Sequence, residues 1–393
     1  MKIAEKAGRR TEARMHRTPL AWRNIVHNKV TMLFSVAAVA FAIIIMFMEL
    51  GFLNGLYDSQ TGVIAFLRAD LVMVSRALHI ITAHEPFPRS RLEKVAGLDG
   101  VSGVYPVYLE DIFSRLRNPK TGIKHHIRVI AFDPGDPIFQ SRRINLLADK
   151  LRSPLTILFD DRSRRFFGPL RSGMKIELAD RAVTVAGTFR LGPDYHYDGN
   201  LLASADTLFQ LFPNQHRENV FLGLIQLKGD ASPDAVVREL NRRAGPDVEI
   251  MKKSDIIARE KANWQKTTPA GYVFTMGVAV GFVIGIFICY QILYIDISDH
   301  LSQLATLKAL GYQNRDLVRQ VLTQGALIGV LGFVPAVAVT LGLYSVLTTI
   351  TGIVTKLTFG RIALVFVLTL GMCLTAAGLA VRKVIALDPA ELF

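Results

Sequence analysis

Four long apolar stretches constrain the fold of this chain more than any other feature of its sequence. They cover residues 30–53, 269–295, 325–350 and 362–381. A membrane core about 30 Å thick is crossed by about 20 helical residues, so each stretch is long enough to span it. We therefore expect an α-helical membrane protein with four transmembrane helices, one before and three after the large stretch of residues 54–268.

The first apolar stretch is expected to stay in the chain as a signal anchor. Its apolar part is longer than that of a cleaved signal peptide, and no small-residue cleavage site follows before polar sequence begins. Glu49 is the one acidic residue inside a span and lies three residues from the outer end of its run. Its carboxylate can reach the interface from there, and a role in handling substrate or protons is the alternative.

Basic residues predict the orientation of the four helices. Residues 1–29 contain eight Lys and Arg and two Glu, segment 296–324 contains three basic residues, and segment 382–393 opens with two more. Lys and Arg accumulate on the cytoplasmic side of membrane proteins. We expect these three segments to be cytoplasmic, the first as a basic tail. Residues 54–268 and 351–361 would then lie outside.

The composition agrees with a membrane protein that also has a large water-exposed domain. The chain is 50% hydrophobic and 20% charged, with a mean hydropathy of +0.31. A net charge of +13 can indicate nucleic acid, but here the basic tail adjoins an apolar stretch, which favours an anionic membrane surface and no nucleic acid. Cys289 and Cys373 both lie in apolar stretches, so we expect no disulfide framework.

Residues 54–268 are predicted to form a mixed α/β domain. The β–α–β spacing at each end predicts a split βαβ unit with residues 133–219 inserted into it. A helix is expected to begin at Ser232 and Pro233, which suit an N-cap and a first turn, and to end at Ala244. The other expected elements are a helix over 89–96 and strands over 69–76, 101–109, 125–132, 182–190, 221–228 and 248–251.

No motif in the sequence indicates catalysis or a metal centre. Residues 168–175 resemble a phosphate-binding loop only superficially, because no Gly-Lys-Ser/Thr follows the gap, so a tight turn is expected. Asp194, His196 and Asp198 alternate as metal ligands could, but turn residues surround them. No serine lies in a nucleophile-elbow pattern. We expect no catalytic site and no metal site, and we interpret the basic–aromatic cluster 162–167 as a solvated face or a protein contact.

Close helix packing is predicted at three glycines of the second apolar stretch. Gly277, Gly281 and Gly285 form two overlapping Gly-x-x-x-Gly steps, a spacing that lets two helices approach closely. The same pattern occurs once more, at Gly325 and Gly329. These glycines could pack within one chain or form the seam of a homodimer, and the sequence leaves both open.

Residues 297–323 form a short polar segment between the second and third apolar stretches. Its leucines recur every third residue and draw a narrow apolar stripe on a helix: Leu301, Leu304, Leu307 and Leu310. Gly311 suits the end of this helix, and a second helical run is expected from Gln313. A helix this short, with an apolar stripe and held at a membrane surface, indicates docking to a partner.

Several segments resemble the MacB-like, or FtsX-like, permeases of ABC transporters. Residues 305–312 (ATLKALGY), followed by a helix and a Gly-rich span, resemble the cytoplasmic coupling segment of that family. Residues 381–393 (VRKVIALDPAELF) resemble its C-terminal signature, and residues 19–52 resemble its amphipathic entry helix and first span. The resemblance thus implies an amphipathic entry helix within residues 1–29. Over nearly its whole length, and most specifically at 290–312, the chain resembles the DevC-type permeases of the heterocyst glycolipid exporter class.

Three further segments add to the DevC-type resemblance: 55–60 (GLYDSQ), 160–169 (DDRSRRFFGP) and 198–202 (DGNLL). The resemblance implies a MacB-like (type VII) ABC permease fold that works as a homodimer with two copies of a separate ABC ATPase. This chain departs from the full MacB pattern because no ATPase domain is fused to it. ATP and Mg would therefore be held by that partner, and no cofactor by this chain. A periplasmic adaptor and an outer-membrane channel are the other implied partners.

The resemblance also implies where the ATPase docks. The expected docking residues lie between Asp299 and Arg319: Asp299, His300, Leu301, Leu304, Leu307, Lys308, Leu310, Gly311, Tyr312, Arg315 and Arg319. The basic residues among them could pair with acidic groups on the ATPase or could be solvated surface charge. The implied location is the bacterial inner membrane, with several passes and with both termini in the cytoplasm.

The function implied by the resemblance is that of a permease subunit in a tripartite ABC exporter. It would relay ATP-driven motion to the adaptor and channel, and so export a glycolipid or another amphiphile. The alternative is a non-transporting transmembrane regulator that uses the same lever to activate a periplasmic enzyme. A third hypothesis, of a different class, is a membrane-bound enzyme that uses its outer domain. A neighbouring adaptor gene would favour export, and a neighbouring hydrolase gene would favour regulation.

Overall fold

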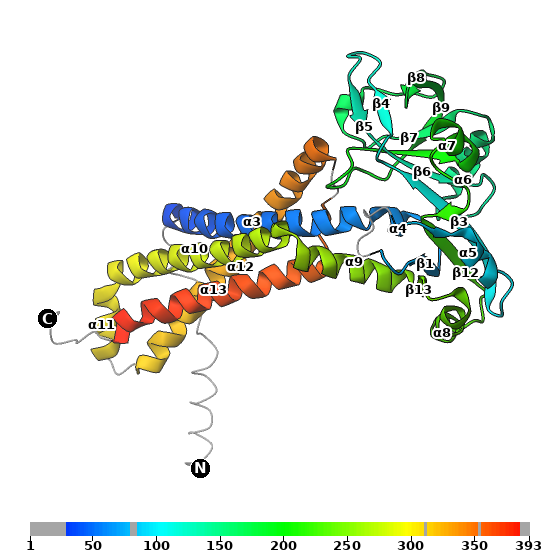
Figure 1. Ribbon diagram of the computed structural model, residues 1–393. Coiled ribbons are helices and arrows are strands. Elements are labelled where there is room, and N and C mark those ends of the chain that lie inside the picture. The colour runs from blue at the N-terminus through cyan, green and yellow to red at the C-terminus, as the bar shows by residue number, and fades with distance from the viewer. Residues whose placement is uncertain (1–28, 79–84, 310–312, 353–354, 386–393) are drawn as a thin grey trace, which may run out of the picture. The chain divides into compact units, whose positions relative to one another are not determined.

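The structure is a computed structural model that describes residues 29–78, 85–309, 313–352 and 355–385. By their internal contacts the residues divide into two units (Figure 1). The helical unit comprises Met1–Leu53, Tyr272–Val346 and Lys356–Phe393, and the α/β unit comprises Asn54–Gly271 and Leu347–Thr355. The predicted fold class is confirmed: one long apolar helix precedes a mixed α/β domain and three follow it.

Four long helices and one short helix form the described part of the helical unit (Figure 1). They are α3 (Lys29–Gln60), α10 (Pro269–Asp299), α11 (Leu301–Ala309), α12 (Asn314–Thr351) and α13 (Phe359–Ile385). The four long helices are sufficiently long and apolar to cross a membrane. They also extend beyond the predicted apolar stretches, because hydropathy marks where a helix leaves an apolar environment and not where its hydrogen bonds end.

Helix α12 shows the largest difference from the prediction. A separate helical run was expected after Gln313, followed by a span beginning near residue 325. In the structure the polar turns and the apolar stretch are one helix of 38 residues, and Pro335 lies inside it. No glycine or proline interrupts residues 314–324, so nothing in this polar stretch breaks the helix.

Small residues allow the four long helices to pack around a shared apolar cluster. Phe47 and Met46 of α3, Leu293 of α10 and Ala336 of α12 are buried in it. Helix α13 contributes mainly small side chains: Cys373, Ala376, Ala377 and Ala380. Many other apolar side chains remain exposed, among them Val280 and Phe287, as expected where a helix faces lipid.

The α/β unit is built on a sheet with eleven described strands (Figure 1). Its first four neighbours, in the order β13-β1-β12-β3, are all antiparallel. Together with two helices they follow the chain order β–α–β–β–α–β, which is the predicted split βαβ unit. Their bounds are β1 (Leu71–Ser75), α5 (Arg89–Val95), β3 (Val101–Glu110), β12 (Leu222–Leu227), α8 (Pro233–Ala244) and β13 (Val248–Lys252).

The inserted part starts earlier than predicted. It follows β3 directly, at residue 111 instead of 133, because β6 pairs with the free edge of β3 and extends the same sheet. Its strands are β4 (Arg115–Arg117), β5 (Lys124–His126), β6 (Arg128–Phe132), β7 (Thr156–Asp160), β8 (Lys175–Leu178), β9 (Arg181–Phe189) and β10 (Asn200–Ser204). The single strand predicted over 125–132 is therefore two strands, broken at Ile127.

Short elements complete the described part of the α/β unit. They are α4 (Gly62–Phe66), β2 (Phe87–Pro88), α6 (Arg142–Ala148), the 3-10 turns η1 (Asp149–Arg152) and η2 (Arg165–Phe167), α7 (Ala205–Leu211), β11 (Asn219–Val220) and α9 (Lys253–Thr267). Ser232 does occupy the N-cap of α8 with Pro233 at the first turn, but its side chain makes no capping hydrogen bond.

The sheet is covered on both faces. Along β1, Leu71 and Met73 belong to one apolar core, whereas Val72 and Val74 belong to another. Successive side chains of a strand point to opposite faces, so these two cores lie on opposite sides of the sheet. A strand buried on both sides is apolar throughout, which explains the uninterrupted sequence LVMV.

A buried arginine at the start of β6 organises the inserted part. Arg128 Nη1 donates to Asp194 Oδ2 at 2.7 Å, and its Nε and Nη2 donate to Asn200 Oδ1 at 2.9 and 2.6 Å. The side chains of Arg128 and Asp194 are only 4% and 1% exposed. Asn200 Nδ2 donates in turn to Asp160 Oδ2 and to Gly192 O, both at 2.8 Å. Charges this deeply buried persist only when they are paired and hydrogen-bonded.

The same network closes the loop between β9 and β10. Asp160 Oδ2 accepts the N–H of Gly192 at 2.7 Å. The ring of Tyr197 packs 4.7 Å from the guanidinium of Arg128, and its hydroxyl donates to Asp111. Burial, followed by the hydrogen bond to Asp111, raises the pKa of Tyr197, so the hydroxyl keeps its proton and remains a donor.

We predict that Arg128→Met destabilises the inserted part of the α/β unit by about 3–5 kcal/mol, because it leaves the Asp194 carboxylate buried without its partner. Hydrogen exchange of the β6 and β10 amides in the full chain would measure the loss. The control is Arg242→Met, which removes an exposed ion pair with Glu239 and should cost less than about 1 kcal/mol. Equal protection in both variants would contradict the structural role of the Arg128 network.

Candidate functional site

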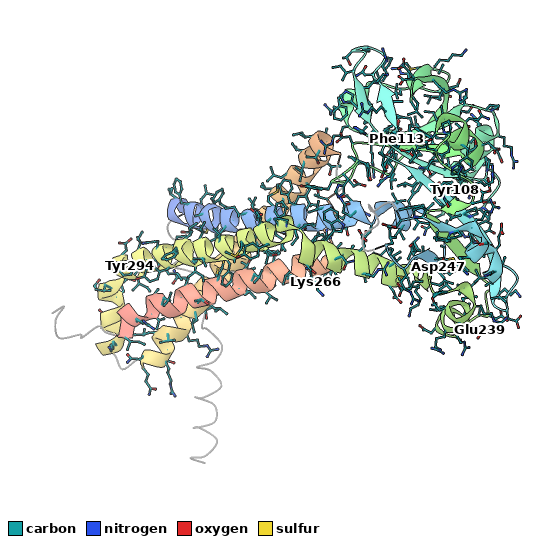
Figure 2. All side chains as sticks on the ribbon, viewed as in Figure 1. Tyr108, Phe113, Glu239, Asp247, Lys266 and Tyr294 are labelled. Atoms are coloured by element: carbon teal, nitrogen blue, oxygen red, sulfur yellow. The ribbon has the colours of Figure 1, made fainter. Side chains whose placement is uncertain are left out.

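The predicted docking segment lies between two long helices. Helix α10 continues past Tyr294 (Figure 2) to Asp299, α11 follows at Leu301, and α12 begins at Asn314. Leu310, Gly311 and Tyr312 lie outside the described residues. The segment therefore has one short helix, α11, between the ends of two helices that each cross the apolar cluster.

A partly buried hydrogen bond joins α10 and α12 at the base of this segment. Gln324 is 5% exposed, and its Nε2 donates to Asp296 Oδ2 at 2.6 Å. Ile297, Leu317 and Val321 are buried around it in the apolar cluster of the helical unit. A charge-assisted hydrogen bond in such surroundings is stronger than one between neutral groups, so it holds the two helix ends together.

The first turn of α12 is stabilised by its own acidic residue. Asp316 is the third residue of the helix, and its Oδ2 accepts the N–H of Gln313 at 3.3 Å. This is half of a capping box, and a negative charge at a helix N-terminus is also favourable. The helix start is therefore fixed beside the polar side chains of Arg315 and Arg319, both of which are exposed.

The described docking residues divide between exposed and packed positions. Asp299 is exposed, and Ser302, Gln303 and Thr306 of α11 are exposed as well. Leu301, the first leucine of the predicted stripe, is half-buried and packs against the apolar cluster. Leu301 therefore helps to hold α11 in place. Leu304 and Leu307 lie within the same helix.

The two remaining predicted docking residues are half-buried. His300 Nδ1 lies 2.9 Å from the Asp296 carbonyl and 3.7 Å from its carboxylate. Lys308 lies in the last turn of α11, where a positive charge is favourable at the negative end of a helix. The arrangement offers hydrogen-bonding and charged groups to a partner protein.

The three predicted packing glycines face α3 of the same chain. A Cβ added at Gly281 would lie 3.2 Å from Ile45 Cγ2 and 3.3 Å from Met46 Cγ. One added at Gly277 would meet the Glu49 carboxyl group. One added at Gly285 would meet the sulfur of Met372 in α13 and would also lie 3.3 Å from Ala42 of α3. These contacts favour packing within one chain. A homodimer seam at the same glycines stays a prediction.

Two further glycines and both cysteines lie where α13 packs on its neighbours. A Cβ at Gly325 would lie 3.0 Å from Ala377, and one at Gly329 would lie 3.0 Å from Cys373 Sγ. Cys289 and Cys373 are both free and buried, with their sulfur atoms 3.4 Å apart. The two thiols bring α10 and α13 into contact. The sequence did not predict this contact, because the cysteines lie in two separate apolar stretches.

The weaker chemical candidates have structural roles. Asp194 pairs with Arg128, and its Oδ1 accepts the N–H of His196 at 2.9 Å, which makes the segment a hydrogen-bonded loop. No cluster of possible metal ligands is found among the described residues. Residues 168–175 form a turn that enters β8, with Gly168 and Gly173 at φ of 82° and 89°. Such φ values favour glycine.

Comparison with known proteins matches residues 275–389 to the model of the FtsX-like permease C-terminal family. No curated protein matches the chain. Among similar solved structures is the periplasmic region of MacB from Actinobacillus actinomycetemcomitans, with 13% identity and a TM-score of 0.35, covering 52% of this chain and 95% of that one. Another is the extracellular domain of the ABC-type transporter YknZ from Gram-positive bacteria, with 12% identity, a TM-score of 0.32, and coverage of 47% and 99%.

Similarities at such low identities and scores say nothing about function. The family match covers the second, third and fourth long helices together with α11. The chain is thus a multi-pass membrane protein with four candidate spans, and residues 275–389 are the part that matches the FtsX-like permease C-terminal family.

We predict that Gly281→Leu lowers the free energy of unfolding by about 1–3 kcal/mol, because the larger side chain forces α10 away from Ile45 and Met46 of α3. Thermal unfolding of the purified chain in detergent would show a lower midpoint. Gly342→Leu on α12 is the matched control, since nothing lies within 4 Å of its added Cβ. A similar midpoint for both variants would mean that α3 and α10 do not depend on close approach.

Proposed function

We propose that the chain is the permease subunit of an ABC-type exporter and is moved by a separate ATPase that docks on residues 299–319. The observation that carries this proposal is the FtsX-like match over residues 275–389, which includes this segment and both helices that flank it. ATP and Mg would be bound by the ATPase subunit, which supplies the energy.

The geometry of the docking segment supports a lever mechanism. Helix α11 is joined to α10 and α12, and their ends are tied by the Asp296–Gln324 hydrogen bond. A push on α11 would move both helices together. Packed interiors transmit displacement because they are nearly incompressible, so the motion would pass along the spans. An effector needs different contacts in its two states to drive such a change, and the exposed polar groups of α11 can provide them.

The remaining parts of the proposal come from the resemblance of the sequence to DevC-type permeases. They are assembly as a homodimer in the bacterial inner membrane, with both termini in the cytoplasm, contact with a periplasmic adaptor and an outer-membrane channel, and export of a glycolipid or another amphiphile. In this scheme the α/β unit is periplasmic and passes motion to the adaptor. The cargo need not cross through the four spans.

We predict that Leu304→Asp combined with Leu307→Asp abolishes docking of the ATPase. Each change places a charge on the predicted apolar stripe, and an unpaired charge in an interface costs several kcal/mol. Co-purification of the chain with its ATPase would measure binding, and an export assay would measure function. Ser302→Asp with Thr306→Asp is the control, because both residues are exposed on the same helix and add the same charge.

Three outcomes distinguish the hypotheses. Loss of binding and export in the leucine variant alone supports the docking site. Binding and export that both survive would show that the ATPase does not grip the leucine stripe. A third outcome would favour the regulator. In it, ATPase binding depends on the leucines, but the wild-type chain exports nothing and instead activates a periplasmic hydrolase.

We predict that the native thiol pair can report whether α10 and α13 shift during the cycle. Oxidation with copper phenanthroline should join Cys289 to Cys373, since their sulfur atoms lie 3.4 Å apart. If the two helices must move apart, export by the oxidised protein should fall to the level without ATP and recover on reduction. Thiol counting with a maleimide after denaturation would confirm the link.

The control for this cross-link is Cys289→Ser, which leaves a single thiol. Its export activity should not change when the oxidant is added. Full export by the cross-linked wild type would show that α10 and α13 move as one body. The motion that drives export would then occur between α3 and the joined helices α10 and α13.

A further inference from the structure

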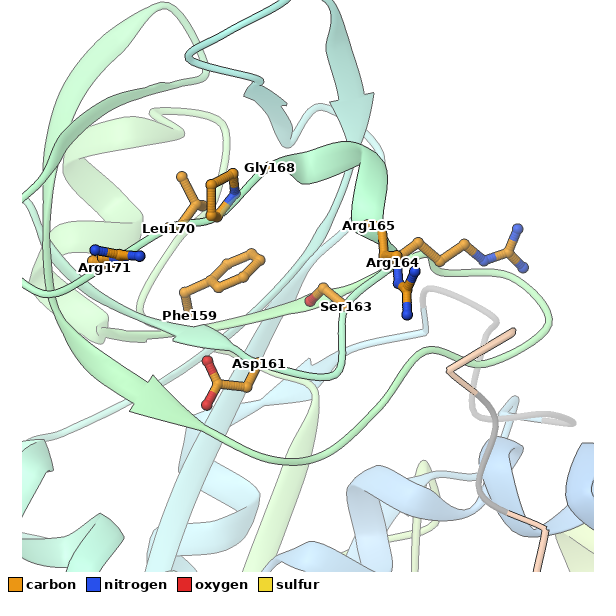
Figure 3. Close-up of a pocket in the computed structure, with 9 residues that line it drawn as sticks. Phe159, Asp161, Ser163, Arg164, Arg165, Gly168, Leu170 and Arg171 are labelled. Atoms are coloured by element: carbon orange, nitrogen blue, oxygen red, sulfur yellow. The ribbon is translucent and has the colours of Figure 1, made fainter. Parts of the chain in front are cut away.

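A basic groove lies on the inserted part of the α/β unit (Figure 3). Its larger part is a cleft of about 520 Å³ lined by the end of β7 and the segment that connects β7 to β8, with Arg164, Arg165 and Arg171 around it and Phe159 and Leu170 on its wall. An adjoining hollow of about 410 Å³ shares Asp161, Leu170 and Arg171 with the cleft and adds Arg143 and Lys150. We refer to the two together as the basic groove.

The charge of the basic groove is strongly unbalanced. Its two parts are lined by five basic residues and one acidic residue, Asp161. Arg164 is paired with Asp198 at 3.0 Å. In the part of the chain that the structure describes, no ion pair is found for the other four: Arg143, Lys150, Arg165 and Arg171. Like charges gathered around a hollow raise the local concentration of anions.

Ion pairing is common elsewhere in the same unit, which makes this gathering unusual. Arg91 pairs with Asp247 at 3.0 Å, and Arg117 pairs with Glu177 at 3.0 Å. Guanidinium groups match carboxylate and phosphate geometry and can hold two oxygens at once. The unpaired arginines of the basic groove are therefore suited to an oxyanion that comes from outside the chain.

Two apolar side chains on the wall of the cleft are held in place. Phe159 and Leu170 are 5% and 6% exposed. Phe167 of η2 is buried, and its ring lies 6.2 Å from that of Phe159 and 5.0 Å from that of Phe166. Ligands bind best where little has to be ordered on binding, so this rigid wall favours affinity.

The aromatic and basic halves of the segment RSRRFF thus have different roles. Phe166 and Phe167 pack in and beside the turn η2, while Arg164 and Arg165, just before and at its start, line one side of the cleft, with Arg171 on the opposite side (Figure 3). The backbone N–H of Arg164 donates to Asp198 O at 2.9 Å, which ties this turn to the loop of the Arg128 network. The arginines are displayed from a fixed backbone.

We propose that the basic groove binds an anionic amphiphile, with its phosphate or carboxylate held at the rim by Arg165 or Arg171 and its apolar part placed against Phe159 and Leu170. The size of the cleft is that of a small-molecule site, which is usually about 300–1,000 Å³ with an apolar lining and a few polar groups. An acidic peptide would use the charges but leave the apolar wall unused.

The test measures binding to the full-length chain in a non-ionic detergent. The probe is a short-chain phosphatidylglycerol with a dye on one acyl chain, followed by fluorescence anisotropy, and the matching phosphatidylcholine is the uncharged comparison. We expect saturable binding of the anionic probe that weakens as salt is raised, because exposed charges are screened. Equal binding of both probes would overturn the proposal.

A charge-reversal pair locates the site. Arg165→Glu with Arg171→Glu should weaken binding of the anionic probe by about a hundredfold, since each lost charged hydrogen bond costs about tenfold or more. Lys94→Glu with Lys228→Glu is the matched control, because both lysines are exposed in the split βαβ half of the unit and the net charge changes equally. Equal weakening in both pairs would show a non-specific charge effect and would overturn the site.

Competition separates the possible sources of the anion. Inorganic phosphate should displace the probe only at much higher concentrations than an unlabelled anionic amphiphile. If phosphate displaces it equally well, or if only an acidic peptide displaces it, the apolar wall plays no part and the assignment fails. Two measurements would exclude misfolding of the Arg165→Glu, Arg171→Glu variant. One is a thermal unfolding midpoint equal to that of the wild type, and the other is recovery of binding in Arg165→Lys with Arg171→Lys. No ATPase takes part in this assay, so its failure would leave the proposed permease role untouched.

Discussion

The close approach of α10 to α3 is the interaction on which the helical unit depends. The two helices are separated in sequence by the whole α/β unit, and in lipid no hydrophobic force draws one apolar helix to another. The three glycines on α10 remove this difficulty. Gly281 brings its backbone against Ile45 and Met46, and the other two bring it against Glu49 and Ala42. Dispersion contacts and interhelical hydrogen bonds can then hold the first helix to the three that carry the FtsX-like match.

The parts of the fold that could be predicted are those set by local sequence. Apolar length predicted the four spans, and turn signals with β–α–β spacing predicted the split βαβ unit. The errors came from contacts between distant residues. The start of the insertion was placed late because pairing of β6 with β3 has no local signal. Helix α12 was divided in two because hydropathy falls at residue 324, although its hydrogen bonds continue through it.

The candidate site was predictable in position but not in construction. A polar segment between spans is visible in the sequence, whereas the Asp296–Gln324 hydrogen bond joins residues 28 positions apart. A polar Gln at the edge of an apolar stretch was the available signal. The Arg128 network was missed for a related reason. Its partners come from three separate loops and strands, and they include segments 160–169 and 198–202 that carried the family resemblance. One residue of each segment, Asp160 and Asn200, is thus explained by the burial of Arg128.

The uninterrupted α12 has a mechanical consequence. At about 1.5 Å per residue, its 38 residues make a rod about 57 Å long, nearly twice the thickness of a hydrocarbon core of about 30 Å. Tilting such a rod by about 5° about one end displaces the other by about 5 Å, close to one helical turn. A small rotation is thus converted into a stroke large enough to change which side chains meet, without any bond in the helix being broken.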